Sequence, residues 1–341
     1  LFGVVAGAEI ANLRLLDIDL QAEGAFFPVV GGLVGRAVAG AGPNVIENVL
    51  VTGSIAADMD GESVTGGTFG GIAGAFGNGR ITNAESRVAL SVSGQADGPG
   101  DVVLIGGVLG RSLGGLTIGG SRYAGRIASA FSGPAGFDDA DSASVIGGLA
   151  GTTLAGDSIR NSTAKGAIDQ TGDGHWVIGG LIGVNRAVLD AVSAAGSITV
   201  TQEAVEDYRT LAVGGLAGRN RAAISRSSAD MAIDLDTSGI VLAGGLIGEN
   251  SGTVRASFAA GSLGLALADL LEFDSIAGIG GLAGTNAGVL ADVQATNSIV
   301  LSGEGMALAG GLAGQNTGRI ARARASGSVA ATLDGDGGPS V

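Results

Sequence analysis

The sequence predicts an all-β protein in which repeated coils of short strands stack into one elongated domain, and three observations lead to this prediction. The motif G-G-[LIV]-x-G recurs with its first glycine at positions 31, 70, 106, 147, 179, 214, 244, 280 and 310. Between the motifs, apolar residues alternate with small or polar ones, which favours strands over helices. Glycine supplies 66 of the 341 residues, while strong helix formers such as Lys, Glu and Gln are few.

Each repeat divides into three segments, taken here in chain order. The first is the glycine motif, and the segment 1–13 is a truncated tenth copy of this part of the repeat. The second contains two aliphatic residues nine positions apart, as in Ile159 and Ile168. The third segment carries the variation in repeat length, which is how loops on one edge of a repeat stack behave. A repeat therefore holds about three short strands, and ten of them predict a rod roughly 45 Å long.

One repeat cannot bury its apolar side alone, so stacking must place equivalent residues in columns. The motif leucines predict one inward column; these are Leu33, Leu149, Leu181, Leu216, Leu246, Leu282 and Leu312. The glycines beside them are expected where the backbone has positive φ or where adjacent strands approach closely.

A ladder of stacked amides is also predicted six residues after the first glycine of the later motifs. Its members are Asn185, Asn220, Asn250, Asn286 and Asn316. Earlier repeats carry Ala37, Phe76, Ser112 and Thr153 at this place. The ladder should therefore be regular only in the C-terminal half.

The repeats resemble the GLUG motif of large bacterial surface and secreted proteins, including haemagglutinin-like adhesins. The closest matches are Gly245-Leu246-Ile247-Gly248-Glu249-Asn250 and Gly311-Leu312-Ala313-Gly314-Gln315-Asn316. The resemblance covers nearly the whole chain. It implies a right-handed parallel β-helix (β-solenoid) over residues 1–341, located outside the cell or on its surface, as a fragment of a larger exoprotein. The family has no catalytic residues in its repeats, so the resemblance transfers none.

Composition excludes several classes of function. The absence of Cys excludes disulfide frameworks and thiolate zinc sites, and a single His excludes paired-His metal sites. A net charge of −14 argues against nucleic acid as a partner. The apolar runs are short and broken by glycine, so no membrane span is expected.

Basic residues concentrate in the first two segments and acids in the third, which predicts an arginine-bearing side and an acidic edge. The simpler explanation of both faces is that charged side chains point into water and keep the rod soluble. The sharper hypothesis is that the arginines bind an anionic polysaccharide, since their donors match carboxylate and sulfate geometry. The candidate arginines are Arg186, Arg219, Arg221, Arg226, Arg255, Arg319, Arg322 and Arg324.

Two further sites are candidates. No cofactor is required by the sequence, but Asp58, Asp60 and Glu62 are the best local candidates for binding Ca²⁺ through oxygen ligands. Trp176, next to His175, either stacks on sugar rings or covers the start of a strand.

We expect a non-catalytic adhesive or spacer module that meets a surface glycan or a protein of a host or neighbouring cell. One alternative is a polysaccharide-degrading enzyme, because parallel β-helices also carry lyases and hydrolases. Paired carboxylates on stacked loops would serve hydrolysis. The other alternative is a filament subunit that associates end to end through open strand edges.

Overall fold

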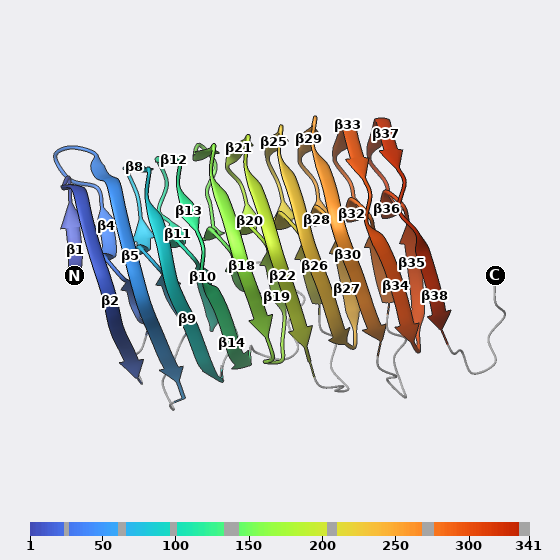
Figure 1. The fold of residues 1–341 in the computed structure, drawn as a ribbon, viewed down its shortest axis with the longest axis horizontal. Coiled ribbons are helices and arrows are strands. Elements are labelled where there is room, and N and C mark those ends of the chain that lie inside the picture. Colours follow the sequence, from blue (N-terminus) through green and yellow to red (C-terminus); the bar gives the residue numbers. More distant parts are fainter. Residues whose placement is uncertain are drawn as a thin grey trace.

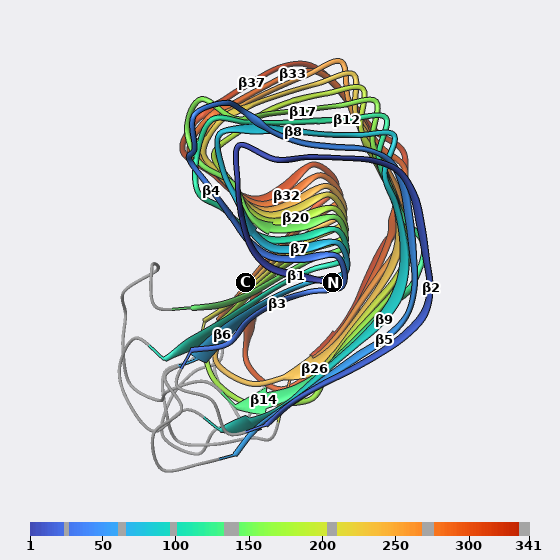
Figure 2. The same cartoon turned by 90° about the vertical axis from the view of Figure 1, so that its left-hand side faces the viewer.

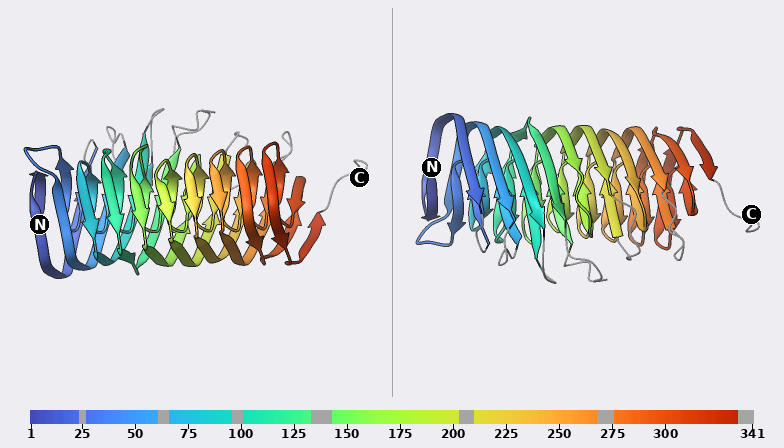
Figure 3. Two further views of the ribbon diagram at one scale, coloured as in Figure 1. Left: turned by 90° about the horizontal axis from the view of Figure 1, so that it is seen from above. Right: turned by 90° about the horizontal axis from the view of Figure 1, so that it is seen from below.

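The computed structural model describes residues 1–23, 27–60, 66–95, 101–132, 143–202, 210–267 and 276–333. All secondary-structure elements in these ranges are β-strands, so the all-β prediction is confirmed. The strands pair in parallel and form three sheets that run side by side along the molecule (Figures 1 and 3).

The first sheet has ten strands, and each one after β1 begins at the fourth residue of its repeat's glycine motif. They are β1 (Phe2–Ala6), β4 (Val34–Val38), β7 (Ala73–Phe76), β11 (Leu109–Ser112), β16 (Ala150–Thr152), β20 (Ile182–Asn185), β24 (Ala217–Asn220), β28 (Ile247–Asn250), β32 (Ala283–Asn286) and β36 (Ala313–Asn316).

The second sheet has nine strands, each ending at the first glycine of a motif. They are β3 (Val29–Gly31), β6 (Gly66–Gly70), β10 (Val102–Gly106), β15 (Ser144–Gly147), β19 (Trp176–Gly179), β23 (Thr210–Gly214), β27 (Ile240–Gly244), β31 (Ile276–Gly280) and β35 (Met306–Gly310).

The third sheet combines short strands with the longer ones that follow them. Its short strands are β8 (Gly79–Thr82), β12 (Leu116–Gly119), β13 (Arg122–Tyr123), β17 (Ser158–Arg160), β21 (Val188–Asp190), β25 (Ala223–Ser225) and β29 (Thr253–Arg255). Its longer strands are β2 (Glu9–Glu23), β5 (Asn44–Met59), β9 (Glu85–Gln95), β14 (Arg126–Ser132), β18 (Thr163–Gln170), β22 (Ser193–Thr201), β26 (Ser228–Thr237), β30 (Phe258–Leu267), β33 (Val289–Ala295), β34 (Ser298–Gly303), β37 (Arg319–Ala325) and β38 (Val329–Leu333).

Equivalent residues of successive repeats lie opposite one another. In the third sheet, for example, Ile168 pairs with Ile198 and Ile198 pairs with Ile233. Figure 2 looks along the stack and shows the equivalent strands one behind another. Residue-for-residue register explains why the sequence repeats by column, since a side chain in each column meets the same kind of neighbour on both sides.

The leucine column lies inside, as predicted. Leu149, Leu181 and Leu216 have no exposed surface, and Ile72 and Val108 fill the same place in repeats without leucine. Leu312 is half-buried, because its repeat has only one described neighbour. The aliphatic pairs of the second segment are buried too, except in the last repeat, where Val329 is 46% exposed.

The motif glycines are required by close approach of backbone. A Cβ on Gly179 would lie 1.9 Å from the carbonyl oxygen of Ile182, and one on Gly180 would lie 2.1 Å from that of Gly215. A Cβ on Gly183 would lie 2.1 Å from Cγ1 of Val145 in the neighbouring nine-stranded sheet. None of these glycines has positive φ. Of the two reasons that the sequence allows, close contact is therefore the correct one.

Candidate functional site

The asparagine ladder is a continuous chain of side-chain hydrogen bonds on the ten-stranded sheet. Nδ2 of Asn185 donates to Oδ1 of Asn220 at 2.8 Å, and Nδ2 of Asn220 donates to Oδ1 of Asn250 at 2.8 Å. The chain continues to Asn286 at 2.7 Å and from there to Asn316 at 2.6 Å. Each amide also serves its own backbone; Asn185, for example, bonds both the N–H and the carbonyl of the residue two positions later.

The ladder begins at a threonine. The hydroxyl of Thr153 donates to Oδ1 of Asn185 at 3.2 Å. Ser112, Phe76 and Ala37, in the preceding repeats, are equally buried, with no exposed surface. One column thus changes from apolar to polar along the rod and stays buried as far as Asn286, while Asn316 in the last described repeat is exposed. The ladder is a structural feature, because the buried amides satisfy one another.

A second column lies where each short strand turns into a long one, and every residue in it has positive φ. We call this column the left-handed corner; it consists of Asn12, Asn48, Asn83, Gly120, Asn161, Ala191, Arg226, Ala256, Asp292 and Arg322. Asparagine and glycine tolerate this conformation better than other residues. The first asparagines form a short ladder of their own, in which Asn48 donates to Asn12 at 3.1 Å and Asn83 donates to Asn48 at 3.3 Å.

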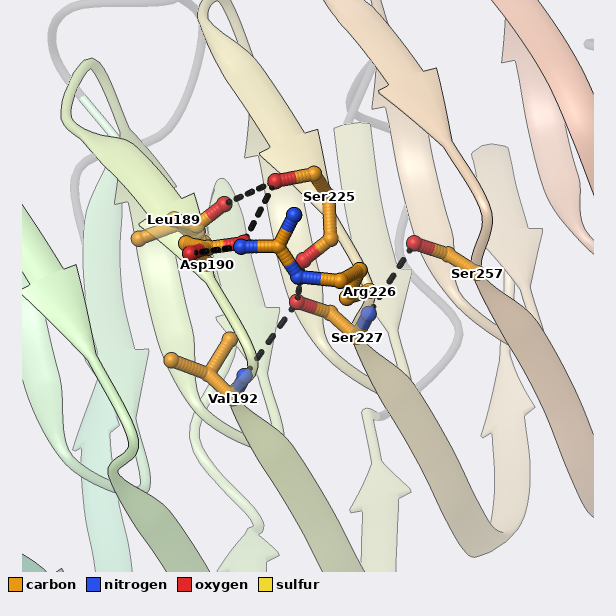
Figure 4. Close-up of polar contacts among 7 residues, drawn as sticks. All are labelled: Leu189, Asp190, Val192, Ser225, Arg226, Ser227 and Ser257. Carbon is orange, nitrogen blue, oxygen red and sulfur yellow. Dashed lines mark hydrogen bonds and ion pairs between the residues drawn. The ribbon is translucent and has the colours of Figure 1, made fainter.

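Serines next to the left-handed corner tie the repeats together. The hydroxyl of Ser227 donates to the carbonyl of Ser225 at 2.7 Å and accepts from the N–H of Val192 at 3.3 Å (Figure 4). The hydroxyl of Ser257 accepts from the N–H of Ser227 at 3.2 Å in the same way. These bonds satisfy backbone groups that the turn takes out of the regular hydrogen bonding between strands.

Arginines of the corner pair with acids of the preceding repeat. Arg226 forms an ion pair with Asp190, which also accepts a hydrogen bond from the hydroxyl of Ser225 at 2.7 Å (Figure 4). The Ser225 bond and the charge of Arg226 lower the pKa of Asp190 against the opposing effect of burial. These contacts cross from one repeat to the next, so they hold the stack together at its surface.

Arg322 and Asp292 form the same arrangement with two hydrogen bonds. Nε of Arg322 donates to Oδ1 of Asp292 at 2.5 Å and its other nitrogen donates to Oδ2 at 2.7 Å. The pKa of Asp292 is lowered by this hydrogen bonding and by the charges of Arg322 and Arg255. Glu85 is similar: burial opposes its ionisation, but Arg87 and Arg122 outweigh burial and lower its pKa.

The structure divides the eight candidate arginines among three places. Arg219 is 5% exposed and pairs with Glu249 at 2.6 Å on the ten-stranded sheet. Arg186 and Arg221 each follow a ladder asparagine directly. Only the remaining five lie at or beside the left-handed corner; these are Arg226, Arg255, Arg319, Arg322 and Arg324. The predicted single arginine-bearing side is thus reduced to this group.

Some of the described acidic residues lie on the outer face of long strands, as Asp230, Asp234 and Asp236 do on β26. Others do not, since Asp190 lies on the short strand β21 and Glu249 on β28 of the ten-stranded sheet. Asp58 is exposed on β5 opposite Glu23, and the N–H of Asp60 donates to its carboxylate at 3.2 Å. Glu62, the third Ca²⁺ candidate, lies outside the described residues. Within the described ranges, no three acidic or His side chains are grouped so that they could hold a metal ion.

The ring of Trp176 has no exposed surface, so it is not available to stack on a sugar. Its Nε1 donates to the carbonyl of Asp173 at 3.2 Å. His175 is also buried, and its Nδ1 accepts a hydrogen bond from the N–H of Thr210 at 3.0 Å. Of the two hypotheses for Trp176, the structure favours the one in which the ring covers the start of a strand, here β19.

Comparison with protein-family models, with the curated proteins and with solved structures finds no match to this chain. Among the described residues, no helix has the length and apolarity that a bilayer crossing needs.

Proposed function

We propose that the chain is a right-handed parallel β-solenoid of ten coils that serves as a non-catalytic adhesive or spacer module. The observation that supports this most directly is the in-register pairing in the ten-stranded sheet, which runs from β1 to β36. Each repeat is joined to its neighbours by backbone bonds, and the asparagine ladder from Thr153 onward and several ion pairs add links between repeats. A stack of this kind resists bending and presents its outer columns at a constant spacing.

The resemblance to GLUG repeats extends this proposal to location and partner. It favours a bacterial surface or secreted protein, of which this chain is one part, and contact with a glycan or with a protein of a host or neighbouring cell. Surface labelling of intact producing cells, with an antibody against the chain, tests the location. Labelling only after lysis would contradict it.

Distances between spin labels test the stiffness and the number of coils. The chain lacks Cys, so a thiol-reactive spin label attaches only to cysteines that are introduced by substitution. Gln21 and Ala330 belong to one outward column, nine repeats apart, and Ser91 lies in the same column two repeats after Gln21. At roughly 4.8 Å per step, we expect about 43 Å for Q21C/A330C and about 34 Å for S91C/A330C. Narrow distributions that differ by about two steps support a stiff solenoid, and broad or equal ones refute it.

Two further assays address the alternatives. Incubation with acidic polysaccharides should release neither reducing ends nor unsaturated products, and release of either would favour an enzyme. Sedimentation over a range of concentrations should show a single species, whereas fibres that grow with concentration would favour a filament subunit.

A further inference from the structure

The outer surface around the last three described turns of the left-handed corner combines positive charge with an exposed aromatic ring. Arg255 ends β29, and Arg319 and Arg324 lie at either end of β37; all three are exposed. Phe258, the first residue of β30, is 49% exposed. An exposed ring beside arginines can offer an apolar face to a ligand whose charged groups pair with the guanidinium groups.

The register places these residues in adjacent columns. Phe258 pairs with Gln294, and Gln294 pairs with Arg324, so these three lie on successive strands about 4.8 Å apart. Arg255 pairs with Ala291, which is two residues beyond Val289, the partner of Arg319. In this column Gln294 therefore lies between the ring and Arg324, and Arg255 precedes the ring by three residues, across the corner at Ala256.

The charges of these arginines are only partly balanced by their surroundings. Arg322, at the corner itself, is held by Asp292 in a two-bond ion pair. Among the described side chains, neither Arg319 nor Arg324 has an acidic partner within 4.0 Å, and Arg255 acts on Asp292 only through its charge. Within the described ranges, Arg319 and Arg324 therefore have no acidic partner, and the charge of Arg255 is balanced only in part, by Asp292.

We propose that Arg255, Phe258, Gln294, Arg319 and Arg324 form a binding site for an anionic polysaccharide. The ring stacks against the apolar face of a sugar, Gln294 bonds a hydroxyl, and the guanidinium groups pair with carboxylate or sulfate on neighbouring units. The inference rests on the adhesive form of the proposed function and identifies its ligand class and its residues.

A polysaccharide suits this surface better than a nucleic acid does. Asp230, Asp234 and Asp236 line the exposed face of β26, the long strand next to β30. The chain as a whole carries a net charge of −14. A double helix, wide and densely charged, would also meet this acidic face, whereas one thin saccharide chain can contact the three arginines alone.

Binding to immobilised polyanions tests the proposal with the full chain. The probes are polygalacturonate and heparin, with neutral dextran and single-stranded poly-dT for comparison. The triple variant R255Q/R319Q/R324Q removes the charges, and R14Q/R36Q/R111Q removes the same number of exposed arginines elsewhere on the rod. F258S, which introduces the residue found at Ser228 in the same column, removes the ring. V300S is its control, since Val300 is 55% exposed on the long-strand face.

We expect the dissociation constant for polygalacturonate or heparin at low salt to rise about tenfold or more in the arginine triple and about threefold in F258S. Both controls should stay within about twofold of the parent chain. The assignment fails if neither polysaccharide binds, if the control triple loses as much affinity, or if poly-dT binds as tightly as the saccharides. If the spin-label distances are narrow but no polysaccharide binds, this binding site is rejected and the proposal of a stiff solenoid is not.

Discussion

Replacing Asn250 with alanine removes a middle link of the asparagine ladder. Asn250 is 1% exposed, donates to Asn286 at 2.7 Å and accepts from Asn220 at 2.8 Å. Alanine leaves a donor on Asn220 and an acceptor on Asn286 without these partners in the interior. A buried polar group left unsatisfied costs about 1–3 kcal/mol. We therefore expect the free energy of unfolding to fall by about 2–5 kcal/mol.

Denaturant unfolding followed by circular dichroism measures the total loss, and hydrogen exchange locates it. The N–H groups of Ser251 and Gly252 both bond to the carbonyl of Asn220 beside the ladder, so their exchange should accelerate. Because stacked repeats are stabilised by nearest-neighbour contacts, exchange in distant repeats should change much less.

Asn316→Ala is the matched control. Asn316 is exposed at the last link, where water can replace the lost bond. This substitution should lower the free energy of unfolding by less than about 1 kcal/mol. The reasoning is refuted if N250A and N316A lose the same amount, or if N250A stays within about 0.5 kcal/mol of the parent chain.

Four further predictions follow from single residues. Asn297 is 3% exposed, and among the described residues neither of its amide atoms has a hydrogen-bond partner; Asn297→Met should raise the unfolding free energy by about 1–3 kcal/mol in denaturant titration, and a decrease would show that the amide is satisfied. Ala256 has a φ of 47°; Ala256→Gly should stabilise by up to about 1 kcal/mol, and a lower melting temperature would contradict this. Gly215→Ala would place a Cβ 2.1 Å from the carbonyl oxygen of Gly245; it should cost at least about 3 kcal/mol, and near-parent stability would show that the backbones can separate. The pKa of Asp292 is lowered in the folded chain, so its ion pair with Arg322 stabilises above the unfolded pKa of about 3.9 and is lost as the pH falls through the folded value. Thermal melts from neutral to strongly acidic pH should show a smaller loss on acidification for D292N than for the parent chain, and equal slopes would contradict the assignment.

The repeated columns could be predicted from the sequence because register copies one environment many times. The motif leucines and the later asparagines keep the same chemistry in most copies, so their spacing alone shows that they stack. The sequence also predicts that the ladder is interrupted in the first half, and the structure confirms this. The identity of the residues at these interruptions, from Ala37 to Thr153, shows how far an interior column can vary while it remains filled.

The left-handed corner could not be found in this way. Its members include Ala191, Arg226 and Asp292, which share a backbone conformation and no side-chain chemistry. The one available signal was asparagine two residues after the first aliphatic residue, in Asn48, Asn83 and Asn161. The pairing of Arg219 could not be predicted for a related reason, because alternation along its own strand does not reveal that Glu249 lies opposite.

The amide ladder has a direction. Every link, from the hydroxyl of Thr153 onward, donates toward the higher-numbered repeat, and Asn316 ends the series with a donor group. Aligned dipoles of this kind strengthen one another. A repeat stacked after Asn316 would continue the ladder if it placed an oxygen acceptor opposite this Nδ2 group, so added repeats extend the ladder in one polarity only.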